Sequence, residues 1–173
     1  NRLGDHFAGW LEHSPEPRGA QAAPLKKRAF LVDLARLELA ICQVFDEAET
    51  PVLTSEQVAA VPWETWERAR LLPIAALRLL RFDYPVHGYL KAVLSEGEPP
   101  PLRKKENFVV VWRQRYSVWR MPLTGPQYRL LDSLRAGTPL AEALGQFPRL
   151  RPGTVFQWFQ DWVSEGFFQS VES

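Results

Sequence analysis

The sequence predicts an α+β protein, with a mainly helical N-terminal half and a C-terminal domain whose elements follow the order β-β-α-α-α-β. Three observations support this fold class. Apolar residues recur at three- and four-residue steps across 29–48, a β-branched and aromatic run fills 108–112, and three short amphipathic segments follow that run. The chain has 173 residues, 46% of them hydrophobic, which is enough to bury a core in one domain or two small ones.

The first half is expected to be helical with a short extended part. The periodic segment 29–48 predicts a long amphipathic helix, and a capping-box spacing predicts a short helix over 55–60, followed by another over 62–68. Pro73 interrupts the nearly continuous apolar stretch that comes next, so we expect two extended segments there rather than one helix. Helical spacing returns over 86–95.

The second half begins with strands and continues with helices. Residues 108–112 and 116–121 predict a β-hairpin, although the residues between them lack the glycine or asparagine that tight hairpin turns prefer. Three capped segments of helical period follow, and the last apolar residues predict a short strand. The helices are expected from 124 to 137, over 140–147 and from about 153 to 166, and the strand over 167–171.

Proline-rich stretches suggest the domain boundaries. We assign 1–24 to the tail of a missing helical domain plus a linker, 25–98 to a helical docking region with short extended segments, 99–106 to a linker and 107–173 to the C-terminal domain. Up to Leu102 the chain has 11 basic and 14 acidic residues, and after it 10 and 6, so the two parts carry −3 and +4. The whole chain carries only +1, so attraction to a polyanion would have to come from a local patch.

No residue pattern predicts catalysis. The sequence lacks HExxH, CxxC and glycine-rich phosphate-binding motifs, and the nearest approach to metal-ligand spacing is His6 with His13. Cys42 is the only cysteine, and its apolar neighbours predict a core position rather than a nucleophile. We therefore expect a non-enzymatic protein with no metal or cofactor. The single cysteine and the absence of a long apolar run favour a cytoplasmic protein with no membrane span.

Tryptophan is abundant, at seven residues. A large apolar ring with one N–H group is favoured where proteins meet, so Trp63 and Trp66 are our candidates for docking a partner protein. Filling of the core is an equally good explanation for each tryptophan.

The element order β-β-α-α-α-β fits a winged helix-turn-helix, in which three helices pack beside a small sheet. Such a domain could bind DNA, with Arg149 and Arg151 near the phosphates. Gln157 and Gln160 of the third helix would then read base edges. That helix carries no lysine or arginine, however, and Asp161 adds negative charge where phosphates would approach. A DNA-binding transcriptional regulator is therefore the alternative function.

The same domain offers a surface for a peptide. We expect the strand at 108–113 to lie at a sheet edge, where a peptide can add as an extra strand and contact the third helix. The positive charge of this half would attract an acidic peptide. The candidate peptide-binding residues are Val109, Val111 and Arg113 on the strand, with Gln157 and Asp161 on the helix.

Three stretches of the chain, LGDHFAGWLE, AFLVDLARLELAICQVFDEAE and AALRLLRFDYPVHGYLKAV, resemble a known family. They are similar to the HvfC/BufC-like proteins, a bacterial group labelled as putative DNA-binding domain proteins, and LVDLARLE at 31–38 is the most specific match. The resemblance implies a partner subunit of the MbnC type for a multi-iron peptide-modifying enzyme. The implied partners are that enzyme, which would hold the iron, and a ribosomally made precursor peptide. The resemblance carries over no catalytic residue.

Overall fold

The computed structural model describes residues 25–172 and mixes helices with strands, so the protein belongs to the α+β class. The predictions made for 1–24, including His6 and His13, lie outside the described residues. In chain order the described elements are α2 (Leu25–Asp46), α3 (Ser55–Ala59), η1 (Trp63–Thr65), β1 (Arg70–Pro73), β2 (Leu77–Phe82), α4 (Val86–Leu94), β3 (Asn107–Gln114), β4 (Ser117–Leu123), α5 (Gly125–Arg135), α6 (Leu140–Gly145), α7 (Pro152–Ser164) and β5 (Phe168–Glu172).

The predicted long helix is confirmed as α2, which buries Leu37, Ala40 and Val44 in the core. The expectation that Cys42 lies in the core is wrong, because its side chain is exposed. Cys42 lies two residues from both Ala40 and Val44, and two residues correspond to roughly 200° around an α-helix. It therefore faces away from the buried stripe.

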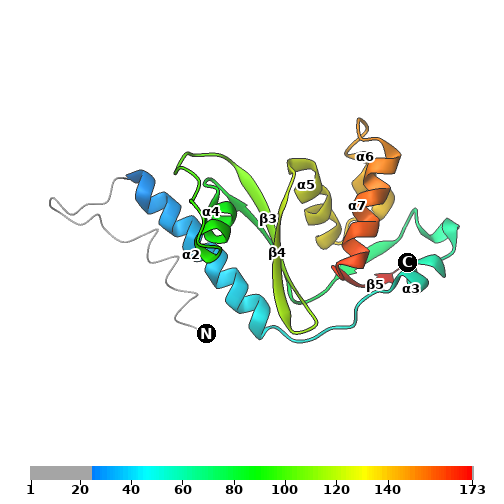
Figure 1. Cartoon of the computed structure of the whole chain (residues 1–173). Helices are drawn as coiled ribbons and strands as arrows, with labels where there is room; N and C mark the ends of the chain where they lie inside the picture. Colours follow the sequence, from blue (N-terminus) through cyan, green and yellow to red (C-terminus); the bar gives the residue numbers. More distant parts are fainter. Residues whose placement is uncertain (1–24, 173) are drawn as a thin grey trace, which may run out of the picture.

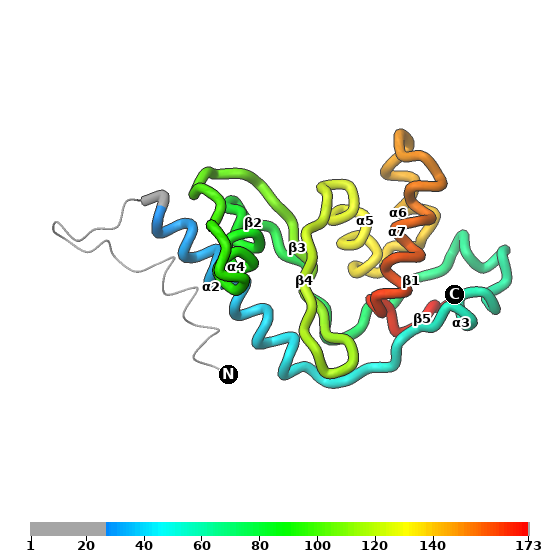
Figure 2. Tube along the Cα trace, viewed as in Figure 1, coloured from blue at the N-terminus to red at the C-terminus, as the bar shows by residue number. Residues whose placement is uncertain are grey.

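A three-stranded antiparallel sheet, in the order β2-β3-β4, forms the centre of the molecule. Figure 1 shows α2 and α4 on one side of this sheet and α5, α6 and α7 on the other. Strands β1 and β5 form a second, two-stranded antiparallel sheet. Between the two sheets, the chain that follows α2 passes the end of the β3–β4 hairpin on its way to α3, as Figure 2 shows.

The two extended segments predicted around Pro73 are confirmed as β1 and β2, but the predicted sheet of the C-terminal domain is wrong. That sheet was expected to contain only strands that follow the proline run at 99–106. Instead, the hairpin pairs with β2, and β5 pairs with β1. Each sheet thus joins strands from both sides of the proline run, and the two halves share one hydrophobic core.

The hairpin turn consists of Arg115 and Tyr116, which both have positive φ, at 49° and 64°. Two central residues of this kind form a type I′ turn, whose twist matches that of the strands on either side. The turn places Gln114 opposite Ser117 and so fixes which backbone groups of each strand point toward its neighbour.

Candidate peptide-binding edge

Strand β3 is not a sheet edge, so peptide addition at 108–113 is excluded. It pairs with β2 on one side and with β4 on the other, and the side chains of Val109 and Val111 are fully buried. The prediction failed because the run FVVVW is apolar at consecutive positions. Consecutive apolar residues are typical of a strand that is covered on both faces, whereas a strand with one open face alternates.

Arg113 has a structural role. Its guanidinium donates to the carbonyl oxygens of Phe45 and Glu47, the latter at 2.8 Å, and so satisfies groups at the C-terminal end of α2. Beside it, Arg78 pairs with the Glu47 carboxylate at 2.6 Å, and this hydrogen bond lowers the pKa of Glu47. Arg113 therefore joins the sheet to α2.

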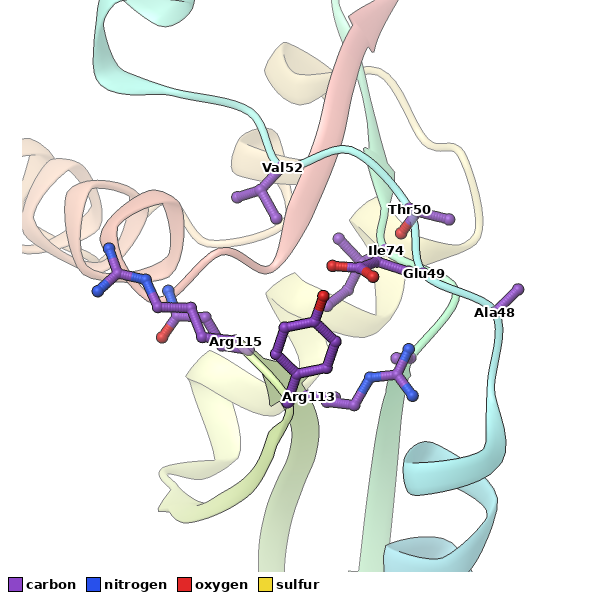
Figure 3. Close-up of a pocket in the computed structure, with 10 residues that line it drawn as sticks. Ala48, Glu49, Thr50, Val52, Ile74, Arg113 and Arg115 are labelled. Atoms are coloured by element: carbon purple, nitrogen blue, oxygen red, sulfur yellow. The ribbon is translucent and has the colours of Figure 1, made fainter.

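Arg113 also lines a small pocket at the end of the hairpin. Figure 3 shows this pocket between the hairpin end, with Arg113 and Arg115, and the segment 48–52. Its volume is about 40 Å³, which holds little more than one ordered water molecule. The pocket is a packing defect where two segments meet and is too small for a peptide side chain.

The other predicted peptide-binding and DNA-binding residues lie on the molecular surface, on α7 or just before it. Gln157 and Asp161 are exposed on α7, and the Gln157 amide donates to the Asp161 carboxylate at 2.8 Å. Gln160 is also exposed on α7, and Arg149 and Arg151 are exposed just before this helix. The structure therefore leaves the residues of the DNA-binding alternative accessible, but it brings neither Gln157 nor Asp161 to an open strand.

The two docking tryptophans have different surroundings. Trp63 is 77% exposed on η1. Trp66 is half-buried, and its ring meets that of Phe159 edge-to-face at 5.7 Å. An exposed aromatic ring thus lies three residues from one that contacts α7.

Sequence analysis missed the edge that the structure leaves open, which is the outer edge of β4. The two-residue turn bonds Gln114 to Ser117, so in an antiparallel ladder Trp119 and Met121 also bond to β3. The alternate residues, Val118, Arg120 and Pro122, then direct their backbone groups outward. The same alternation explains why the Arg113 N–H donates to the Ala76 carbonyl on the β2 side. Within 25–172, no backbone group pairs with the outer edge of β4.

Pro122 could have revealed this edge from the sequence, because proline occurs in sheets mainly on edge strands. Trp119 marks the same strand, since its ring is 52% exposed in a segment where the pairing partner Trp112 is buried. The sheet also ends at β2, but there the outward carbonyl of Leu77 already accepts a hydrogen bond from Arg78. The outer edge of β4 is therefore the better template for an added strand.

Beside β4, Arg120 and Lys91 lie close enough to His87 for their charges to act on its ring. Burial, followed by the charges of Arg120 and Lys91, lowers the pKa of His87 from its ordinary value of 6.5. His87 Nδ1 and Arg120 Nε are both buried and have no hydrogen-bond partner. Buried polar atoms are nearly always bonded, so these two nitrogens are exceptions, as is Trp112 Nε1 in the core.

A second surface lies between α6 and α7. Its groove has a volume of about 460 Å³ and only apolar residues line it, including Leu144, Phe147 and Phe159. Phe156 also lines the groove and is 60% exposed. A groove of this kind accepts apolar side chains of a protein.

Within the described residues, no group of three or more His, Cys, Asp or Glu side chains could hold a metal ion. No helix of residues 25–172 has both the length and the apolar character needed to cross a bilayer. In comparisons with known proteins, no family model matches the chain, and no curated protein matches it.

Proposed function

We propose that the protein is a non-catalytic partner subunit that binds a ribosomally made precursor peptide and presents it to a multi-iron modifying enzyme. The single observation that supports peptide binding is the outer edge of β4, where Val118 and Arg120 offer N–H groups without a described backbone partner. A peptide in extended conformation satisfies such groups by joining the sheet as a fourth strand next to β4. The identity of the enzyme comes from the family resemblance.

The enzyme docks on a different surface in this proposal. Trp63, with most of its ring exposed, is one anchor, and the second is the apolar groove between α6 and α7, which lies across the central sheet from α2 (Figure 1). Exposed aromatic anchors beside an apolar groove are the usual centre of a protein–protein interface. Peptide and enzyme can therefore bind at the same time.

The test of peptide binding is fluorescence anisotropy with labelled peptides tiled over the short reading frames beside the gene. The informative variant is Val118→Pro, which removes one outward N–H group without breaking the ladder between β3 and β4. Val118→Ala is the matched control, because it shortens the same side chain and keeps that N–H. One hydrogen bond is worth about 1 kcal/mol, so we expect Val118→Pro to weaken binding by roughly fivefold.

Two results would count against the proposal. If no tiled peptide binds, with or without the modifying enzyme, the chain is not a peptide-binding subunit. If a peptide binds but Val118→Pro and Val118→Ala behave alike, the peptide does not join the sheet at β4. Circular dichroism of both variants shows whether the fold is intact.

A further inference from the structure

Arg120 lies on the outer edge of β4, where both its backbone and its side chain can contact an added strand. Its backbone groups point outward, and its side chain lies on the sheet face that carries Val111, its partner on β3. Val111 is buried on the face that α2 covers, because Arg113 lies two positions along β3, on the same face, and bonds to the end of α2. In a strand added to β4, the residue opposite Arg120 would project its side chain on the same face, at a Cβ–Cβ distance of about 5 Å.

Two residues of α4 accompany Arg120 near that position, because the charges of Arg120 and Lys91 both act on His87. His87 and Lys91 of α4 are the described residues whose charge, or capacity for charge, accompanies Arg120 there. Neither His87 Nδ1 nor Arg120 Nε has a hydrogen-bond partner, although both atoms are buried. None of the ion pairs between described residues involves Arg120 or Lys91. Arg120 and Lys91 therefore bring positive charge to this place with no acidic partner among the described ion pairs, and the ring of His87 has one nitrogen left unbonded.

We propose that the captured peptide carries an aspartate or glutamate opposite Arg120, and that its carboxylate binds Arg120 and His87. This inference rests on the proposed function and names the feature by which β4 selects its peptide. A carboxylate has the acceptor capacity that both orphan nitrogens require, and its charge balances a guanidinium within hydrogen-bonding distance. An apolar residue at that position would leave the buried donor of Arg120 unsatisfied.

The preference of β4 for an acidic peptide follows from the cost of leaving the Arg120 donor without an acceptor. A strand with asparagine or glutamine in place of the acid can form the same backbone bonds but loses a charge-assisted one. We expect such a change to weaken binding about tenfold, while removal of an acid elsewhere in the peptide changes binding less than twofold.

The experiment uses anisotropy with the tiled peptides, each tested also with single Asp→Asn or Glu→Gln changes. The protein variants are Arg120→Gln and, as the matched control, Arg115→Gln, which removes an equal charge from the exposed hairpin turn. We expect one acidic peptide position to matter, and its effect to disappear in Arg120→Gln but persist in Arg115→Gln. NMR titration of His87 provides a second readout: the acidic peptide raises its pKa, and the amide version of the peptide does not.

The outcomes separate the two proposals. If no peptide binds, the peptide-binding function itself fails. If peptides bind through β4, as judged by Val118→Pro, but acid-to-amide changes and Arg120→Gln have no effect, the carboxylate site is refuted and the strand addition stands. If Arg115→Gln weakens binding as much as Arg120→Gln, general charge attraction accounts for the binding, and the specific site is again refuted.

Discussion

Asp33 provides the clearest stability prediction, because it is the buried charged residue of the described core. Its Oδ2 accepts hydrogen bonds from the backbone N–H groups of Asp83 at 2.8 Å and Tyr84 at 3.0 Å. Its Oδ1 lies 3.4 Å from Arg36. One side chain of α2 thus holds the turn between β2 and α4.

We expect Asp33→Ala to lower the free energy of unfolding by about 2–4 kcal/mol. A hydrogen bond to a charged acceptor is worth about 1.5–3 kcal/mol, and the substitution removes two. The N–H of Tyr84 would lie in the protein interior without a partner, whereas that of exposed Asp83 could bond to water. The cost of burying the carboxylate offsets part of the loss, so the net effect is smaller than the sum of the two bonds.

Asp33→Asn is the matched control. Its amide oxygen still accepts from the backbone and carries no charge to desolvate, so we expect a loss of about 1 kcal/mol or less. Urea unfolding followed by circular dichroism measures both variants. The reasoning is refuted if Asp33→Ala unfolds within about 0.5 kcal/mol of the unsubstituted protein, or if Asp33→Asn loses as much as Asp33→Ala.

The unsubstituted protein and the Asp33→Asn variant should also differ in how their stability depends on pH. Burial raises the pKa of Asp33 above its ordinary value of 3.8, against the opposing effect of the two backbone N–H groups and Arg36. The folded protein then binds the proton more readily than the unfolded chain, so this group's contribution to stability falls as the pH rises from 3.8 through the folded-state pKa. Over that window, the stability of Asp33→Asn relative to the unsubstituted protein should rise with pH. A relative stability that falls with pH would contradict the assigned direction.

Four further predictions concern the backbone, a helix cap and nucleic acid. Gly166→Ala should destabilise the protein by about 1–3 kcal/mol in thermal unfolding, because φ of Gly166 is +72° and the new Cβ would lie 3.1 Å from a methyl group of Val52. Gly145→Ala in α6 should be neutral or stabilising by up to about 1 kcal/mol, because no atom lies within 4 Å of the new Cβ. Thr124→Ala should cost about 1 kcal/mol in urea unfolding, because Thr124 forms a capping box at the start of α5. In gel-shift assays at about 50 mM salt we expect no binding of duplex DNA; binding that fades steeply by about 200 mM salt and weakens in Arg149→Gln or Arg151→Gln would favour the regulator alternative.

Local patterns in the sequence predicted the elements well. The capping-box spacing at Thr54 predicted α3, and both side chain–backbone bonds of that box are present. The position of Pro73 correctly separated β1 from β2. These features depend on interactions within a few residues, and such interactions are visible in a linear sequence.

Strand pairing was the part that local patterns could not predict. The hairpin 108–121 was found, but its neighbour proved to be β2, which lies about 30 residues earlier in the chain, and β5 paired with the still more distant β1. Pairing between distant strands depends on which apolar faces meet in the folded core. The consecutive apolar residues of β3 already pointed to a central strand, and Pro122 to an edge.

The candidate site in the structure differs from the predicted site because it also depends on strand pairing. The sequence predicts peptide binding at Val109, Val111 and Arg113 on the premise that 108–113 is an edge strand, yet two are core residues and the third binds the end of α2. The basic cluster beside β4 joins Arg120 to His87, which lies 33 positions earlier. Only the tertiary structure brings these side chains together.

Amide hydrogen exchange measured by NMR, with and without a bound tiled peptide, tests strand addition at β4 most directly. The free protein should protect Trp119 and Met121, whose N–H groups bond to β3, and leave Val118 and Arg120 exchanging quickly. On peptide binding, Val118 and Arg120 should gain protection by roughly tenfold or more, while Trp119 and Met121 change little. Protection that instead increases only along the α6–α7 groove, with Val118 and Arg120 unchanged, would contradict the proposal that the peptide extends the sheet.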